Sequence, residues 1–298
     1  GVAMTTRREI HLSCIPSMVS MLVKAATCRK PKQSNPQFLP IKVSATGIKV
    51  DPKKLDRFRA VCGFSSADTL PLSYPHIMAF ALHLQLLLEP ECPFAPAGAV
   101  HVRNRIRQQR SIGVDETLDF CAYIEGAKQV DKGFEVSIIT EVRVSDELVW
   151  DDLSVMLIRK GGSGIKKEKK QATQAPTYTE SLQWQLASNK GRQYAAAAGD
   201  YNPIHLFPAT AKLMGFKRHI MHGMWGKSRV IAHLLPPDYE GAVSIDVSFK
   251  LPIFLPATIT LLSNSDSHSS RFELKDGKGE KPHLAGEMQL GVGITQSY

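Results

Sequence analysis

The chain has 298 residues, of which 43% are hydrophobic and 22% are charged. This length can bury a sizeable core without disulfides or metals, and the composition excludes a disulfide-stabilised miniprotein and a disordered tail. No run of ~18 uninterrupted apolar residues is present, so we expect no membrane span. Lys plus Arg outnumber Asp plus Glu by 37 to 28, and the net charge of +9 favours anionic partners.

The five cysteines form no Cys-x-x-Cys pair. An odd number of cysteines without such pairs fits neither a disulfide framework nor a zinc ribbon. This usage is typical of a reducing compartment, and we expect a cytoplasmic protein.

Along the chain, the first predicted element is a helix over about residues 16–28 that docks on the body of the protein, and a mitochondrial transit segment is the alternative interpretation of this stretch. A linker is predicted at residues 161–176, where small residues and lysines leave almost nothing to bury. It divides the chain into residues 1–160 and residues 177–298, called here the first and second halves. The linker lysines lack the interleaved aromatic residues that stack on bases, so we expect no nucleic-acid partner.

Two tripeptides recur at an offset of 143 positions and indicate an internal repeat. His-Ile-Met occurs at 76–78 and 219–221, and Gly-Ala-Val at 98–100 and 241–243. The His-Ile-Met copies are followed by apolar helical segments, and the Gly-Ala-Val copies by segments with strand periodicity. Strands are expected at 100–107, 117–125, 134–144, 148–158, 243–251, 257–262, 270–274 and 283–292. Each half is therefore predicted to be an α+β unit, in which an antiparallel sheet wraps one helix.

The second half has a longer loop before its His-Ile-Met, and this loop contains Asp200, Asn202 and His205. Asn202 precedes a proline, which disfavours helical backbone and predicts a turn. A carboxylate and an imidazole that converge on one cavity can act as a general acid–base pair. The same residues are also common turn formers, so a purely structural role is the alternative.

The motif His222-Gly223-Met224 opens the apolar helix of the second half. Glycine permits close approach of a ligand, and the free N–H groups of a helix start suit a developing oxyanion.

The run Tyr194-Ala-Ala-Ala-Ala-Gly-Asp-Tyr-Asn-Pro-Ile-His205, with His222-Gly223-Met224 and Ser248-Phe249-Lys250-Leu251-Pro252, resembles the MaoC-like family of (R)-specific enoyl-CoA hydratases and 3-hydroxyacyl-thioester dehydratases. The resemblance covers residues 188–292, and the first half resembles the non-catalytic half of two-repeat members. It implies a double hot-dog fold, with two antiparallel sheets each wrapped around a central helix. The catalytic half would be residues 177–298.

By this resemblance Asp200 and His205 transfer protons, Asn202 orients the site, and the N–H of Gly223 holds the thioester oxygen. The implied reaction is the reversible hydration of a trans-2-enoyl thioester to an (R)-3-hydroxyacyl thioester in fatty acid metabolism. It requires no metal and no cofactor beyond the coenzyme A or acyl carrier protein that carries the substrate. Which of Asp200 and His205 handles which proton stays open, as does the choice between a monomeric pseudo-dimer and a homodimer.

Further residues are candidates for substrate binding. Lys212, Lys217 and Arg218 would contact the phosphates of coenzyme A or an acidic carrier protein, or else form a solvated basic face. Phe80 and Leu84 of the first half would line an acyl tunnel, which predicts a preference for medium or long acyl groups, or else fill the core.

Three alternatives to hydration stay open. Hot-dog scaffolds also host acyl thioesterases, because fold does not dictate function. The chain could instead be a non-catalytic partner that binds acyl thioesters. The composition also permits a metal site built from Asp200, His205, His219 and His222, although their spacing matches no usual pair of helical ligands.

Overall fold

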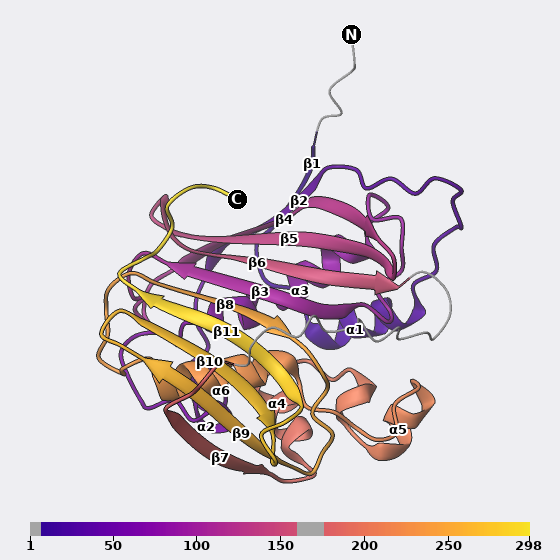
Figure 1. The fold of residues 1–298 in the computed structure, drawn as a ribbon. Helices are drawn as coiled ribbons and strands as arrows, with labels where there is room; N and C mark the ends of the chain where they lie inside the picture. Colours follow the sequence, from indigo (N-terminus) through magenta and orange to yellow (C-terminus); the bar gives the residue numbers. More distant parts are fainter. Residues whose placement is uncertain (1–6, 160–175) are drawn as a thin grey trace.

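A computed structural model describes residues 7–159 and 176–298. Within these ranges one sheet of eleven strands runs through the whole molecule, in the order β1-β2-β4-β5-β6-β3-β8-β11-β10-β9-β7 (Figure 1). Among the described strands only β1 and β2 pair in parallel, and the other neighbours are antiparallel. The strands are β1 (Arg8–Leu12), β2 (Ile41–Ile48), β3 (Val100–Gln108), β4 (Leu118–Val130), β5 (Gly133–Val144), β6 (Glu147–Arg159), β7 (Glu180–Leu186), β8 (Val243–Phe249), β9 (Ala257–Ser265), β10 (Ser269–Asp276) and β11 (Pro282–Leu290).

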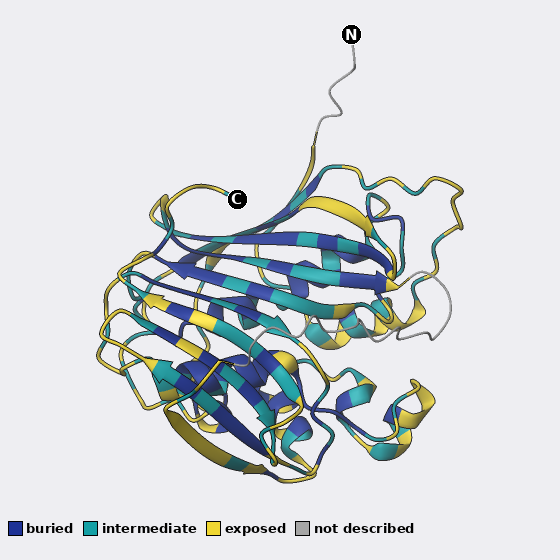
Figure 2. Cartoon of the chain, in the orientation of Figure 1, coloured by how far each residue is buried: buried dark blue, intermediate teal, exposed yellow. Residues whose placement is uncertain are grey.

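The helices that the sheet wraps are α3 in the first half and α6 in the second, and both are mostly buried (Figure 2). By contrast, α5 projects from the body and is largely accessible to solvent (Figures 1 and 2). The α+β architecture predicted for each half is confirmed. The helical elements are α1 (Met18–Thr27), α2 (Pro52–Cys62), α3 (Tyr74–Leu88), α4 (Lys190–Ala198), the 3-10 turn η1 (Pro203–His205), α5 (Pro208–Leu213) and α6 (Gly223–Leu234).

The two halves meet at β3 and β8, which pair antiparallel. The two sheets expected from the sequence are therefore joined edge to edge, and this pairing satisfies N–H and C=O groups that two free edges would expose. The repeated Gly-Ala-Val is a true structural repeat, since its last residue begins β3 at Val100 and β8 at Val243. Asn104 lies opposite Val247, its counterpart at the same sequence offset. A pseudo-twofold axis therefore passes through this pair.

The repeated His-Ile-Met adopts different structures in the two halves. Residues 76–78 lie in the first turns of α3, which Pro75 helps to begin. Residues 219–221 are extended, and the N–H of Met221 donates to the carbonyl of Ile253 (2.8 Å). The second helix therefore starts only at Gly223. The prediction that both His-Ile-Met copies precede equivalent helices is wrong in this detail, because backbone pairing of residues 219–221 delays the start of the helix in the second half.

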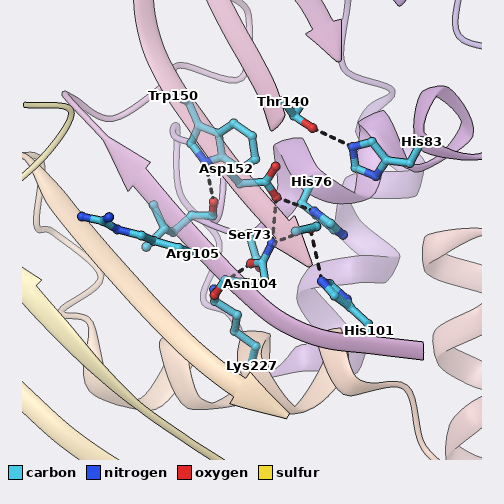
Figure 3. A network of polar contacts seen from close by, with 12 residues as sticks. Ser73, His76, His83, His101, Asn104, Arg105, Thr140, Trp150, Asp152 and Lys227 are labelled. Carbon is cyan, nitrogen blue, oxygen red and sulfur yellow. Dashed lines mark hydrogen bonds and ion pairs between the residues drawn. The ribbon is translucent and has the colours of Figure 1, made fainter. Parts of the chain in front are cut away.

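A buried polar network holds α6 against the first half (Figure 3). Lys227 is 0% exposed, and its Nζ donates to the main-chain oxygen (2.6 Å) and Oδ1 (2.7 Å) of Asn104. The Asn104 amide donates to Asp152 Oδ2 (2.9 Å), which also accepts from Nδ1 of His76 (2.5 Å). The network thus joins α6 to α3 through β3 and β6. The network holds α6 at Lys227, which lies one helical turn after Gly223.

Helix α1 confirms the helix expected at residues 16–28. The side chain of Ser17 caps it. Met21 packs with Ala81 and Leu84 of α3 in a buried apolar cluster. Helix α1 is thereby docked on the first half, as predicted.

Two sequence-based expectations concern regions beyond these elements. The linker predicted at residues 161–176 lies outside the described residues except for Pro176, so the domain boundaries stay predictions. Among residues 7–159 and 176–298, no helix is long and apolar enough to cross a membrane.

Candidate active site

The longer loop of the second half leaves α4 and turns back on itself. Helix α4 ends at Ala198, and its C-cap residue Gly199 has a φ of 84°, in the left-handed region that glycine adopts without strain. Asp200 Oδ1 then accepts the N–H of Asn202 (3.1 Å), and Asn202 Oδ1 accepts an N–H of η1 (3.3 Å). Pro203 favours the extended backbone seen at Asn202. These turn-forming contacts bring His205 back towards Asp200.

His205 is held as one tautomer beside Asp200. Its Nδ1–H donates to the carbonyl of Ile220 (2.7 Å), and because a carbonyl can only accept, neutral His205 has a bare Nε2. Nε2 lies 4.0 Å from Oδ2 of Asp200. This separation is too long for a direct hydrogen bond but short enough for one oxygen to contact both groups. Burial lowers the pKa of His205, so that the ring is neutral at neutral pH.

At Gly191, helix α4 packs closely against the main chain of His205. A Cβ at Gly191 would overlap the carbonyl oxygen of His205 and would also touch Leu255. Since only glycine permits this approach, Gly191 sets how far His205 lies from α4.

The motif His222-Gly223 is adjacent to the same pair. The ring of His222 stacks on that of His205, and its Nε2–H donates to the main-chain oxygen of Asp200 (2.9 Å). Gly223 begins α6 and packs against Phe249, whose ring Cδ1 would lie 3.1 Å from a Cβ at this position. The structure therefore brings together Asp200, Asn202, His205 and the first N–H groups of α6.

The predicted cationic residues lie around α5 rather than beside the acid–base pair. Lys212 is exposed on α5. The Nζ of Lys217 lies 4.4 Å from the ring centroid of Phe254. The Nε of Arg218 is buried and has no hydrogen-bond partner among the described residues. These side chains form a basic surface around α5, and among the described residues none of them makes a hydrogen bond or ion pair with Asp200 or His205.

Phe80 and Leu84 face α1. Leu84 is 8% exposed and belongs to the cluster with Met21, and Phe80 packs against that cluster. Met18, at the start of α1, links this cluster to the loop, because its Cγ lies 2.8 Å from where a Cβ of Gly199 would be. Helix α1 thus covers the surface that was predicted to line an acyl tunnel.

The geometry of the histidine cluster is also compatible with a metal. Asp200, His205 and His222 each place one ligand atom within 4.8 Å of the others. His219 is not part of this group, and its Nε2 bonds the main-chain oxygen of Ser188 (2.7 Å). The absence of a metal requirement therefore stays a prediction.

Comparisons with known proteins identify the family. A family model described as MaoC like domain matches residues 165–286. The chain is 30% identical to 3-hydroxyacyl-thioester dehydratase X of Mycobacterium tuberculosis over 271 residues, which cover 90% of this chain and 96% of that protein. The chain belongs to the MaoC-like family. This MaoC-like protein is also 41% identical over 71 residues to the (R)-specific enoyl-CoA hydratase of Aeromonas caviae, over 22% of this chain and 52% of that enzyme.

Solved structures of the MaoC-like family agree with the fold. The crystal structure of HtdX from Mycobacterium tuberculosis matches with a TM-score of 0.73 and 28% identity, over 84% of this chain and 99% of that one. A MaoC-like dehydratase from Phytophthora capsici matches with a TM-score of 0.65 and 19% identity, over 86% of this chain and 96% of that one, and supports the fold alone. The double hot-dog fold predicted from the sequence is confirmed.

Proposed function

We propose that this MaoC-like protein is a hydro-lyase that adds water reversibly to a trans-2-enoyl thioester and forms an (R)-3-hydroxyacyl thioester. The observation that carries the proposal is the bare Nε2 of His205, 4.0 Å from Oδ2 of Asp200. Two groups at this separation can contact one water molecule and can transfer protons on the same face of a substrate. The names of the two curated relatives, a dehydratase and a hydratase, support the same reaction.

In the direction of hydration, His205 Nε2 takes a proton from water, and the water oxygen bonds to C3 of the enoyl group. The electrons of the double bond move towards the thioester oxygen, where the N–H of Gly223 stabilises the developing charge. The carboxyl group of Asp200 gives a proton to C2. Proton transfer from His205 to Asp200 then restores both groups. Asn202 keeps Asp200 in place by donating its N–H to Oδ1.

The basic surface around α5 supports a substrate carried by an anionic group. From Tyr201 to Pro237 the sequence contains no Asp or Glu. Lys212, Lys217 and Arg218 would bind the phosphates of coenzyme A or an acidic carrier protein. Lys212→Ala should raise KM at low salt, and the effect should shrink as salt screens the charge. A smaller effect is expected from Lys217→Ala, because Lys217 also contacts Phe254.

Turnover of crotonyl-CoA, followed by the loss of enoyl-thioester absorbance, tests the proposed reaction. Asp200→Asn and His205→Gln should each lower kcat by roughly two to four decades while circular dichroism stays unchanged. Asp238→Asn and His268→Gln change exposed residues of the same types and are the matched controls. Near-wild-type turnover in either site variant would reject the assignment.

The same reaction mixture distinguishes hydration from the two remaining alternatives. A thioesterase would release free thiol, which a thiol reagent detects, whereas hydration leaves the thioester intact. A non-catalytic binding protein would change neither signal. Chiral analysis of the product checks the predicted (R) configuration.

A further inference from the structure

His222 lies between the acid–base pair and the start of α6 and is 3% exposed. Its ring stacks on that of His205, with centroids 3.6 Å apart and planes inclined by 22°. The ring of Tyr194, from α4, packs against His222 with a centroid distance of 4.6 Å. His222 therefore covers one face of His205 and keeps water from it.

His222 is the N-cap residue of α6, yet its side chain makes no capping hydrogen bond. An N-cap side chain usually accepts one of the free N–H groups of the first helical turn. The ring of His222 instead donates Nε2–H to the main-chain oxygen of Asp200 (2.9 Å). The N-cap side chain therefore takes up none of the first N–H groups of α6, which include that of Gly223. A substrate oxygen can bind these groups.

The protonation state of His222 is fixed by its surroundings. With its proton on Nε2, neutral His222 has a bare Nδ1, and this buried atom has no hydrogen-bond partner among the described residues. Burial lowers the pKa of His222 well below its ordinary value, and repulsion from His205 whenever that ring is protonated lowers the pKa of His222 further. The titratable groups that face it are Asp200, His205 and Tyr194, and burial raises the pKa of Tyr194 well above its ordinary value. His222 and Tyr194 therefore stay neutral, and neither takes part in the proton transfers proposed for His205 and Asp200.

We propose that His222 is a positioning residue for the acid–base pair. Stacking fixes the ring plane of His205, and the hydrogen bond from Nε2–H fixes the main chain of Asp200. The inference rests on the proposed function. It predicts an effect on kcat rather than on KM, because His222 contacts the residues that transfer protons and not the basic surface around α5.

Three variants separate the two contacts. His222→Phe keeps a flat ring without a donor, His222→Gln keeps a donor without an aromatic ring, and His222→Ala removes both. We expect kcat to fall by about 10-fold in each of the first two variants and about 100-fold in the third, with KM within about 3-fold of wild type. His233→Phe, in the last turn of the same helix, is the matched control and should keep the wild-type kcat.

A pH titration of the His205 ring by NMR gives a readout that does not depend on turnover. His222→Ala exposes one face of His205 to water, so the pKa of His205 should rise towards its ordinary value. In His222→Phe the face stays covered, and the pKa should stay low. Wild-type kcat in His222→Phe and His222→Ala, or an unchanged titration of His205 in His222→Ala, would overturn the proposal.

Two further outcomes are informative. A loss of kcat that only follows the loss of folded protein, measured by circular dichroism, would mean that His222 serves the fold alone and would also overturn the proposal. If the wild-type protein hydrates no enoyl thioester, the proposed function fails, but the titration still decides whether His222 covers His205.

Discussion

Replacing Gly191 by alanine tests whether the approach of α4 to η1 sets the position of His205. A buried carbon and a carbonyl oxygen ordinarily lie about 3.3–3.6 Å apart, and a Cβ at Gly191 would lie so close to the oxygen of His205 that the two backbones must separate by roughly 1 Å. Alanine normally stabilises a helix by about 1 kcal/mol relative to glycine, but overpacking of this kind costs about 1–3 kcal/mol. We therefore expect modest net destabilisation, by up to about 2 kcal/mol.

The larger effect should be on turnover. A displacement of about 1 Å at a catalytic group can lower the rate by about 100-fold, so kcat/KM for crotonyl-CoA should fall by about that factor in Gly191→Ala. Urea unfolding measures the stability separately. Gly126→Ala is the control, because a Cβ at Gly126 meets no atom within 4 Å. If folded Gly191→Ala works within twofold of wild type, the contact does not position His205 and the reasoning is refuted.

Further measurements probe the same site and the core. Burial lowers the pKa of His205 below its ordinary 6.5, so kcat/KM should stay level as pH falls to 6.5 and decline only at more acidic pH; a decline already above pH 6.5 would contradict this. Exhaustive chelation should leave the rate unchanged, and activity lost on chelation and restored by zinc would show that the histidines bind a metal. Burial lowers the pKa of Lys227 to about 7, so between pH 7 and 9 the unfolded chain holds a proton that the folded protein has lost. Raising the pH over this range should stabilise the wild type relative to Lys227→Met by about 2 kcal/mol in urea unfolding. A loss of relative stability with rising pH would contradict a lowered pKa of Lys227 in the folded protein. Comparing crotonyl, octenoyl and dodecenoyl thioesters tests the expected preference for longer acyl groups, which equal kcat/KM values would disprove.

The sequence was informative where one face of an element is buried. The alternation from Val243 onwards predicted β8, and the apolar runs predicted α3 and α6. Strand β7 was not predicted, because it is the last strand of the sheet and most of its residues are exposed, so that no alternation marks it. The parallel pair β1 and β2 was also missed, because no local pattern indicates which distant strand β1 joins.

The candidate site shows a similar division between local and long-range information. The short spacing of Asp200 and His205 made their proximity predictable, since one turn connects them. The stacking of His222 on His205 joins residues from separate elements, and the sequence analysis brought these two histidines together only as possible metal ligands. Lys227 was missed because helix lysines are usually exposed. Its spacing from Met224 and Ile231, both buried on α6, was a signal that could have placed it in the core.

The pairing of Asn104 with Val247 has a consequence for how such a protein can evolve. In a dimer of identical chains, a residue on the twofold axis must face a copy of itself, and every buried charge occurs twice. Here both copies belong to one polypeptide, so an amide faces an aliphatic side chain. Lys227 reaches across to Asn104, whereas the residue 143 positions before Lys227 is the uncharged Leu84. Covalent fusion therefore removes the requirement that a mutation suit both sides of the axis. One half can keep the proton-transfer loop while the other changes its interior independently.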